Sequence, residues 1–249
     1  MNWVRKRKLP VIEAIKYNDR PCLTSESLWN TLHSTFNIAL HRQVNVKILH
    51  ELAQKPSQNW GPFSKYEFLS AISKCADSSS PGPDRLTWHH WKIIVKNDAC
   101  LSNVINIADT YINLGHWPRY FKVSTTVVIP KLNKLSYDNP KAFCPIVLLN
   151  TLGKLIEKVI TEQLQFTVAS NNFIHPSQLG GLKFKSTADA GIALTHIVRS
   201  GWAKGKATNS LAFDISQFFP SLNHCFLVLI LEKAGLDSKV VSFFSNYLT

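Results

Sequence analysis

Apolar residues recur at three- and four-residue spacing along most of this chain, and clusters of Pro, Gly and Ser interrupt the pattern. This spacing is typical of amphipathic helices. The predicted helices lie near 24–36, 64–75, 101–112, 152–166, 186–200, 222–234 and 238–248. Two short apolar runs, Ser124–Ile129 and Leu211–Ile215, predict strands. Many helices with few short strands indicate an α+β fold, and 249 residues leave room for one or two domains.

Local signals mark several of these boundaries. Ser64 and Glu67 stand in the S-x-x-E spacing of a capping box, which predicts a helix start. The run Ser78–Asp84, with the sequence SSSPGPD, predicts a turn after that helix. Lys55–Pro62 contains two prolines and a glycine, and it is interpreted as a linker.

The charge favours an anionic partner. Lys and Arg number 28 and Asp and Glu number 16, which gives a net charge of +12. Both halves of the chain share this excess, so it does not come from one tail. Nucleic acid is the first candidate partner and a membrane surface the second.

Five scattered cysteines, an odd number without C-x-x-C spacing, argue against a disulfide framework and a structural zinc site. The longest apolar run has only seven residues (225–231), so no membrane span is expected. The basic run Arg5–Lys8 is not followed by an apolar segment, so a signal peptide is not expected either. These features predict an intracellular protein of the nucleus or cytoplasm that is not secreted.

No phosphate-binding loop, dinucleotide fingerprint, serine-hydrolase elbow or H-E-x-x-H motif occurs in the chain. The adjacent His89 and His90 would point in two directions from a helix, which disfavours a shared metal. The more informative residue is Asp214, a single carboxylate inside an apolar run. A divalent metal could compensate for its burial, and phosphoryl transfer commonly uses metals held by such carboxylates. The alternatives are that Asp214 caps the helix beginning near Ser221 or pairs with a lysine.

Residues 213–224, with the sequence FDISQFFPSLNH, resemble motif A of reverse transcriptases in the form used by non-LTR (LINE-type) retrotransposons. Four earlier segments resemble other blocks of this family and occur in the family's order. They are Ser80–Asp84, Gly115–Lys131, Asn139–Asn150 and Gln178–Ala190. The resemblance covers roughly residues 60–249, and the amino-acid sequences of the blocks look most like those of elements from basidiomycete fungi.

The resemblance implies a right-hand polymerase that adds deoxynucleotides to a primer 3′-OH on an RNA template, a nucleotidyltransferase reaction using Mg²⁺ or Mn²⁺. Residues 1–60 would form an N-terminal extension and linker. Residues 61–208 would form a fingers-like region, and residues 209–249 the start of the palm. The expected fragment is truncated before the remaining palm and thumb.

The resemblance also implies roles for single residues. Asp214 would be the catalytic metal ligand, with the backbone carbonyl of Ile215 beside it. Phe219 would be the steric gate against a ribose 2′-OH, the alternative being a plain core aromatic beside Phe218. Lys131 would reach the incoming triphosphate, the alternative being a solvated turn lysine. Gln178 would lie near the path of template and primer.

Two departures from the family pattern stand out. Cys144 occupies the position where the family has Arg, and a thiol cannot replace the bidentate grip of a guanidinium on phosphate. The Tyr-x-Asp-Asp block is absent, and no adjacent Asp-Asp pair occurs anywhere in the 249 residues. One carboxylate cannot hold two metals, so this chain alone is expected to be inactive and to bind no metal tightly.

Rival interpretations remain open at this point. The chain could be a non-catalytic basic nucleic-acid-binding domain or a functionless relic, and a protein-interaction domain is a third possibility. A severed palm would also leave the inward faces of the helices near 222–234 and 238–248 uncovered, together with Phe213 and Phe219. That consideration predicts a loose region after about residue 208.

Overall fold

The computed structural model describes residues 15–36, 45–171, 173–215 and 217–249. The basic run Arg5–Lys8 and Ser216 lie outside this part of the chain. The helices are α1 (Ser25–Phe36), α2 (Lys47–Glu51), α3 (Lys65–Ser73), α4 (Trp88–Ile94), α5 (Asp98–Asn113), α6 (Arg119–Lys122), α7 (Thr151–Ser170), α8 (Thr187–Ala203), α9 (His224–Lys233) and α10 (Ser238–Leu248). The strands are β1 (Lys16–Tyr17), β2 (Arg20–Pro21), β3 (Ser124–Pro130) and β4 (Phe143–Leu149), and the 3₁₀ turns are η2 (Pro140–Ala142) and η3 (Phe219–Ser221). This mixture of helices and small sheets is compatible with the predicted α+β class.

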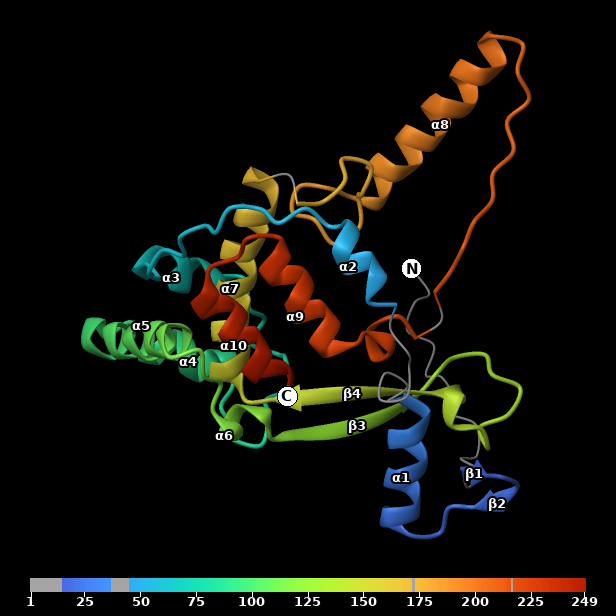
Figure 1. Cartoon of the computed structure of the whole chain (residues 1–249). Helices are drawn as coiled ribbons and strands as arrows, with labels where there is room; N and C mark the ends of the chain where they lie inside the picture. The colour runs from blue at the N-terminus through green and yellow to red at the C-terminus, as the bar shows by residue number, and fades with distance from the viewer. Residues whose placement is uncertain (1–14, 37–44, 172, 216) are drawn as a thin grey trace, which may run out of the picture.

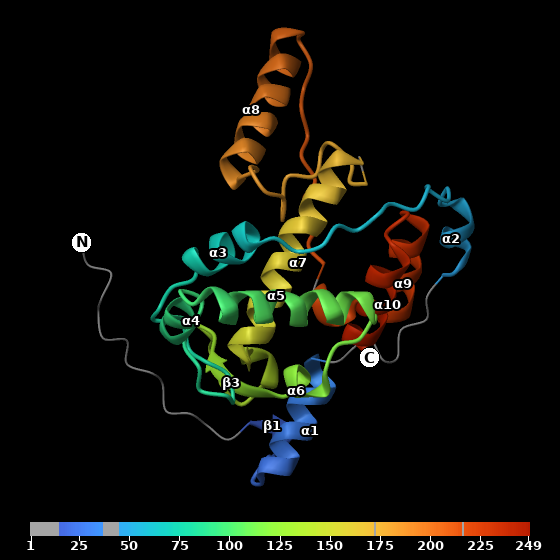
Figure 2. The same cartoon turned by 90° about the vertical axis from the view of Figure 1, so that its left-hand side faces the viewer.

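The main hydrophobic core surrounds α7, which runs through the middle of the helical body (Figures 1 and 2). Leu155, Ile156 and Val159 project from α7 into this core and are fully buried. They are one, three and four residues apart, the spacing of one helix face. Phe68 of α3 and Leu101 of α5 meet them from other helices. The predicted periodicity of the 152–166 segment is therefore confirmed as a core-facing stripe.

The last helix, α10, also packs into this core. Val240 and Phe243 are buried, and Phe243 meets Trp117 edge-on at a ring-centroid distance of 5.5 Å. The backbone N–H of Trp117 donates to the Asn246 side chain at 2.7 Å, and Tyr247 adds a second ring 5.6 Å from Trp117. The expectation that the inward face of 238–248 lies open is thus wrong for α10, because α5 and the Trp117 region cover it.

The segment that the sequence suggests as a linker, 55–62, is fixed to the turn between α9 and α10. The N–H of Lys55 donates to the Lys233 carbonyl and that of Gln58 to the Gly235 carbonyl, both at 2.9 Å. The N–H of Trp60 donates to the Asp237 carboxylate at 3.1 Å. Gly235 has φ +81°, and a Cβ there would lie 2.3 Å from the Pro56 carbonyl oxygen, so only glycine fits this contact.

β3 and β4 form an antiparallel hairpin, with Ser124 opposite Leu149 and Pro130 opposite Phe143. One face of the hairpin packs on a small N-terminal unit made of β1, β2 and α1, which lies below it in Figure 1. Leu32 of α1 is buried there together with Phe143 and Tyr137. Asn18 and Asp19 both adopt positive φ and close the turn between β1 and β2.

The helix α8 and the segment that follows it project away from the rest of the molecule (Figures 1 and 2). No residue of α8 is buried. Residues 204–215 return from its tip as extended chain without regular structure. The prediction of a strand at Leu211–Ile215 is therefore wrong for this structure, because no strand in the described part of the chain pairs with this segment and supplies the hydrogen bonds that a strand needs.

Candidate nucleic-acid interface

Asp214 lies in the exposed segment that returns from α8. Its neighbours Phe213 and Ile215 are also exposed, Phe213 by 86%. Among the described residues, no side chain forms an ion pair with Asp214 within 4 Å. The alternative role of Asp214 as a helix cap is not seen either, because the side chain of Asn223 caps α9 by accepting from the Phe226 N–H at 2.9 Å.

Phe219 begins the 3₁₀ turn η3 and is 79% exposed. Its ring contacts that of Phe218 edge-on at 5.4 Å. The alternative of a core aromatic is therefore wrong for this structure. The role of Phe219 as a steric gate stays a prediction.

The β3–β4 hairpin brings two of the predicted residues to one side. Ile129 lies opposite Cys144, so their side chains share a face, and Lys131 continues that face by strand alternation. The Lys131 N–H donates to the Ala142 carbonyl at 2.8 Å, which extends the pairing by one step. The Lys131 ammonium donates to the Lys141 carbonyl at 3.0 Å, and Cys144 is an exposed free thiol.

The other face of the hairpin forms an apolar cavity of about 530 Å³ with α1. Val128, Pro145 and Val147 line it from the strands, and Pro220 lines it from the end of the motif A segment. The described geometry therefore puts Lys131 and Cys144 on one face of the hairpin and the neighbourhood of Phe219 at the other. It does not assemble them with Asp214 into one site.

Gln178 lies in the loop between α7 and α8. Its N–H donates to the His175 carbonyl at 2.9 Å and its side-chain amide to the Gly180 carbonyl at 3.3 Å. The loop covers a cavity of about 520 Å³ against the end of α7. Sequence reasoning missed the aromatic and basic residues around Gln178, namely Phe166, Lys183, Phe184 and Lys185. The available signal was the absence of any acidic residue from 163 to 188.

The block at Ser80–Asp84 anchors the junction of β4 and α7. A Cβ on Gly82 would lie 2.3 Å from the Leu149 carbonyl oxygen, so the backbones meet there without room for a side chain. The Asp84 N–H donates to the buried Asn150 side chain at 3.1 Å. The Thr151 hydroxyl donates to the Leu86 carbonyl and accepts from the Trp91 indole at 2.7 Å. Asn150 and Thr151 are structural residues that the sequence analysis did not single out.

The Ser186–Asp189 pair of the last block before motif A is a capping box for α8. The Ser186 hydroxyl and N–H each donate to the Asp189 carboxylate at 2.7 Å. These hydrogen bonds hold the pKa of Asp189 below its ordinary value. Similarly, the Lys74 ammonium lies 2.7 Å from the Glu162 carboxylate and lowers its pKa.

Divalent metal ions require several oxygen ligands. Asp214 and the carbonyl of Ile215 would supply two. Across residues 15–36, 45–171, 173–215 and 217–249, no three His, Cys, Asp or Glu side chains come together as a metal site. The described residues therefore do not by themselves fit the two-metal centre that the resemblance implies.

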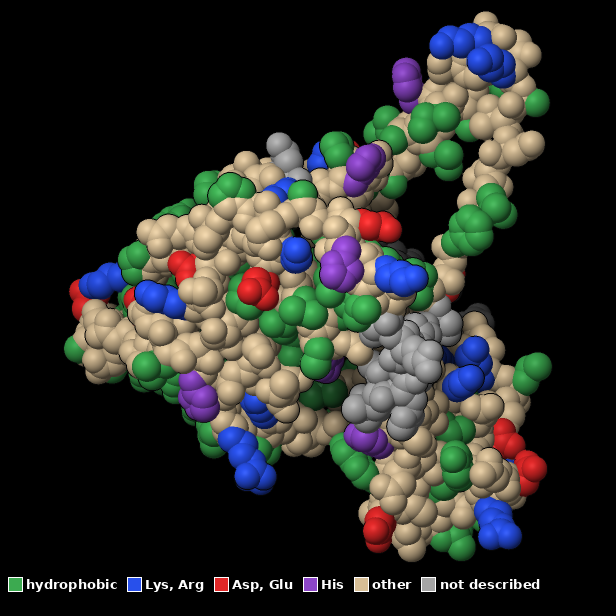
Figure 3. Space-filling model, in the orientation of Figure 1, with side chains coloured by type: hydrophobic (Ala, Val, Ile, Leu, Met, Phe, Trp, Pro, Cys, Tyr) green, Lys and Arg blue, Asp and Glu red, His purple; other side chains and the backbone are tan. Residues whose placement is uncertain are grey.

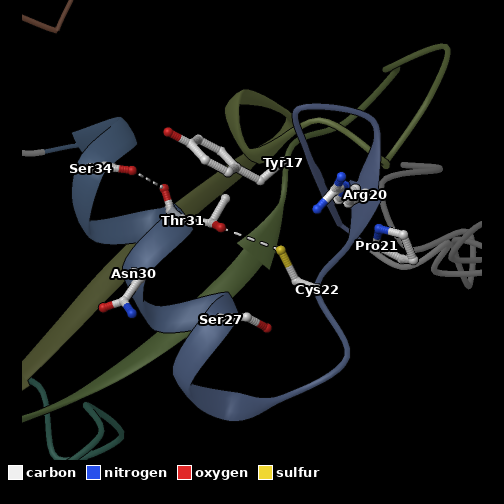
Figure 4. A pocket seen from close by; sticks show the side chains of 8 residues that line it. All are labelled: Tyr17, Arg20, Pro21, Cys22, Ser27, Asn30, Thr31 and Ser34. Atoms are coloured by element: carbon white, nitrogen blue, oxygen red, sulfur yellow. Dashed lines mark hydrogen bonds between the residues drawn. The ribbon is translucent and has the colours of Figure 1, made fainter.

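A further cavity, of about 450 Å³, lies at the N-terminal unit between the β1–β2 turn and α1 (Figure 4). Tyr17 of β1 and Arg20 of β2 line it, and the Thr31 hydroxyl lies 3.3 Å from the Cys22 thiol. None of the predicted site residues belongs to this cavity. It lies outside the region that carries the family resemblance.

Cations are dispersed over the visible face of the molecule, and a group of them marks the tip of α8 (Figure 3). The chain near this tip carries Arg199, Lys204 and Lys206, and no acidic residue occurs from 190 to 213. Within the described part of the chain, no helix combines the length and the apolar character that crossing a membrane requires.

No known protein-family profile matches the chain. It is similar to a retrovirus-related Pol polyprotein from the type-1 retrotransposable element R2 of Popillia japonica, with 26% identity over 188 residues, 76% of this chain and 24% of that protein. The corresponding R1 polyprotein of Bradysia coprophila is 25% identical over 172 residues, 68% of this chain and 16% of its own length. A probable RNA-directed DNA polymerase from the transposon BS of Drosophila melanogaster is 24% identical over 173 residues, 69% of this chain and 19% of its own length. The chain thus spans about a quarter or less of these relatives, which are retrotransposon polymerase proteins.

Proposed function

We propose that this chain is part of the reverse transcriptase of a non-LTR retrotransposon. In the intact parent, it would take part in adding deoxynucleotides to a primer 3′-OH on an RNA template. Residues 61–208 would correspond to the fingers and residues 209–249 to the start of the palm, within a protein of the nucleus or cytoplasm. The proposed fungal origin of the element rests on the amino-acid sequences of the blocks alone, because the relatives described above come from insects.

The observation that carries the proposal is the shared face of the β3–β4 hairpin. Lys131 and position 144 project from the same side of this hairpin, close to its turn. A lysine and an arginine placed in this way could grip one triphosphate together. In this chain position 144 is a cysteine, so the proposed triphosphate site has the Lys131 ammonium but lacks the arginine guanidinium.

Asp214 and Phe219 keep their proposed roles as metal ligand and steric gate in the parent enzyme. Mg²⁺ or Mn²⁺ would be held there by Asp214, the carbonyl of Ile215 and carboxylates that this chain does not supply. The 249-residue chain is therefore proposed to bind nucleic acid and to lack polymerase activity. The absence of the Arg at position 144 equally favours the second candidate, a non-catalytic nucleic-acid-binding relic.

Nucleotide binding tests the proposed grip. Cys144→Arg should raise the affinity for a deoxynucleoside triphosphate by about fivefold or more, because charge-assisted hydrogen bonds contribute about 1.5–3 kcal/mol. Cys144→Ser is the matched control and should have no effect. Lys131→Ala in the Cys144→Arg background should remove the gain. Calorimetric titration measures all of these variants, and a Cys144→Arg protein with unchanged affinity would contradict the grip.

Nucleic-acid binding and primer extension test the rest of the proposal. The net charge of +12 should give weak binding of RNA and DNA that falls steeply between low and high salt. Purified protein should not extend a DNA primer on an RNA template with Mg²⁺ or Mn²⁺. Extension that disappears in Asp214→Ala would overturn the proposal that this chain lacks activity by itself.

A further inference from the structure

An aromatic and basic surface surrounds the cavity between the end of α7 and the loop 173–186. Phe166 projects from α7 and is 74% exposed, and Phe184 projects from the loop and is 92% exposed. Large aromatic rings are normally at least partly covered in a folded protein. Two of them at the rim of one cavity of about 520 Å³ therefore suggest a ligand with flat faces.

The backbone at Phe184 supports a ligand role. Phe184 has φ +62°, the left-handed region that bulky residues rarely adopt. The loop around it is held by short-range hydrogen bonds, including Lys185 N–H to the Leu182 carbonyl at 3.3 Å. A bulky residue held at positive φ with its ring in solvent, as Phe184 is, justifies a functional hypothesis for that ring.

The charges around the two rings favour an anionic ligand. Lys183 and Lys185 flank Phe184, and the Lys183 ammonium lies 5.6 Å from the Phe184 ring centroid. Among the described residues that line the cavity, the carboxylate is that of Glu162, which pairs with Lys74 at 2.7 Å and lies 4.0 Å from Lys183. From residue 163 to residue 188 the chain has no acidic residue.

We infer that this surface binds single-stranded nucleic acid, with Phe166 and Phe184 stacking on unpaired bases and Lys183 and Lys185 contacting phosphates. Proteins that bind single strands combine these two features, because every base has a face for stacking and every linkage has a charge. A duplex does not present its base faces, so it would gain only the phosphate contacts. The inference rests on the proposed nucleic-acid-binding function and names the form of nucleic acid that this surface takes.

Gln178 and His175 would lie beside the stacked bases. The side-chain amide nitrogen of Gln178 donates one hydrogen bond to the Gly180 carbonyl, which leaves its second N–H as a donor and its oxygen as an acceptor. The Nδ1 atom of His175 accepts from the Ser177 N–H at 3.2 Å, so in the neutral ring the proton is assigned to Nε2, which can donate to a base or a phosphate.

The test compares single strands with a duplex. Fluorescence anisotropy would measure the binding of a labelled 12-nucleotide oligo-U, a 12-nucleotide oligo-dT and a 12-base-pair duplex to the same protein. Phe184→Ala and Phe166→Ala should each weaken both single strands by about fivefold or more and leave the duplex unchanged. Oligo-U and oligo-dT should respond alike, because stacking reads the face of the base.

Three further variants separate stacking from charge and from folding. Phe184→Trp keeps an aromatic face and should keep single-strand affinity. Tyr66→Ala removes a ring that is 79% exposed on α3, far along the chain from the loop, and should have no effect. Lys185→Ala should weaken single strands and duplex alike and reduce the salt slope by about one.

Unchanged single-strand affinity in both phenylalanine variants would overturn the inference, as would an equal loss for single strands and duplex. Either result would leave salt-dependent binding of the wild-type protein, and with it the proposed function, intact. Failure of the wild-type protein to bind any of the three probes at low salt would instead contradict the proposed function as well. Urea unfolding of each variant confirms that affinity changes do not arise from unfolded protein.

Discussion

The helices α8 and α10 form for similar local reasons and meet very different surroundings. Both begin at a polar cap, Ser186 for α8 and Asp237 for α10. Both carry large apolar side chains, yet α10 buries Val240 and Phe243 while α8 buries nothing. Helix formation is set by nearby residues, whereas burial depends on which distant surface the chain brings to the helix. In this molecule the Trp117 region receives α10, and no described element receives α8.

The largest contrast should appear on truncating one phenylalanine in each region. Phe243→Ala removes a buried ring from the aromatic cluster around Trp117, so it should destabilise the protein by about 3–5 kcal/mol. Phe213→Ala removes an exposed ring from the segment after α8 and should change stability by less than about 0.5 kcal/mol. Urea unfolding measures both variants. Comparable losses would show that the segment after α8 packs against the body in solution.

Hydrogen exchange sharpens the same contrast at the level of single segments. Amides of α7 and α10 open only when the core opens, whereas those of α8 and 204–215 can open locally. Protection in α10 should exceed that in α8 by at least about 100-fold, or about 2.8 kcal/mol at about 1.4 kcal/mol per tenfold. Mass spectrometry of peptic fragments resolves the two helices. Equal protection in both would contradict the division into a closed body and an open arm.

The hydrogen bond between Tyr247 and Glu157 predicts that the free energy of unfolding of the part containing α7 and α10 depends on pH. The Tyr247 hydroxyl donates to the Glu157 carboxylate at 2.9 Å, joining α10 to α7. Burial raises the pKa of Glu157 above its ordinary value of 4.5, although the Tyr247 hydrogen bond partly opposes this shift. It also raises the pKa of Tyr247, and the neighbouring carboxylate adds to this effect.

A carboxyl group whose pKa is raised on folding stabilises the protein fully below its unfolded pKa, and this contribution is lost as the pH rises through the raised value. Tyr247→Phe removes the donor to the ionised carboxylate, so it should cost about 1–2 kcal/mol at pH 8 and less at pH 4. Glu157→Gln should stabilise the protein at pH 8 relative to its effect at pH 4. Unfolding curves at the two pH values check both variants, and a loss in Tyr247→Phe that does not vary with pH would contradict the assignment.

The smallest effect compares two capping boxes of the same design. Ser64→Ala removes the cap of α3, a helix of the closed body, and should lower stability by about 1 kcal/mol. Ser186→Ala removes the cap of α8 and should leave the global unfolding free energy unchanged, while the first turn of α8 exchanges faster. Circular dichroism during urea unfolding measures the first effect and hydrogen exchange the second. A global loss in Ser186→Ala would mean that α8 is coupled to the core.

The sequence predicted the helices well because their signals are local. The capping box at Ser64 and the turn after α3 lie where the residues predict them, and the helix predicted from Ser186 begins there with a capping box that the sequence analysis does not name. The prediction of a strand at 211–215 is wrong, because a β-strand requires a hydrogen-bonded partner strand and the sequence of 211–215 alone does not show whether such a partner exists. The burial of α10 was also missed, since its contacts with Trp117 join residues more than a hundred positions apart.

The candidate site shows the same limit. Motif spacing pointed to Lys131 and Cys144, and only the hairpin register shows that they share a face. The family block points to Gln178 but not to Phe184, because the exposure and the positive φ of Phe184 depend on the three-dimensional course of the loop. The sequence predicts Gly82 as part of a turn, whereas its close approach to the Leu149 carbonyl is a feature of the structure alone.

The hydrogen bonds that join residues 55–60 to the α9–α10 turn have a consequence for biosynthesis. Trp60 and Asp237 are 177 positions apart, so the first partner leaves the ribosome long before the second is made. At about 5–20 residues per second, the interval is roughly 9–35 s. During this time the Trp117 region has no α10 to cover it, and its aromatic surface is open to chaperones. The body can therefore close only after the segment that carries Asp237 and α10 has left the ribosome, so its folding depends on a part of the chain that is made much later than residues 55–60.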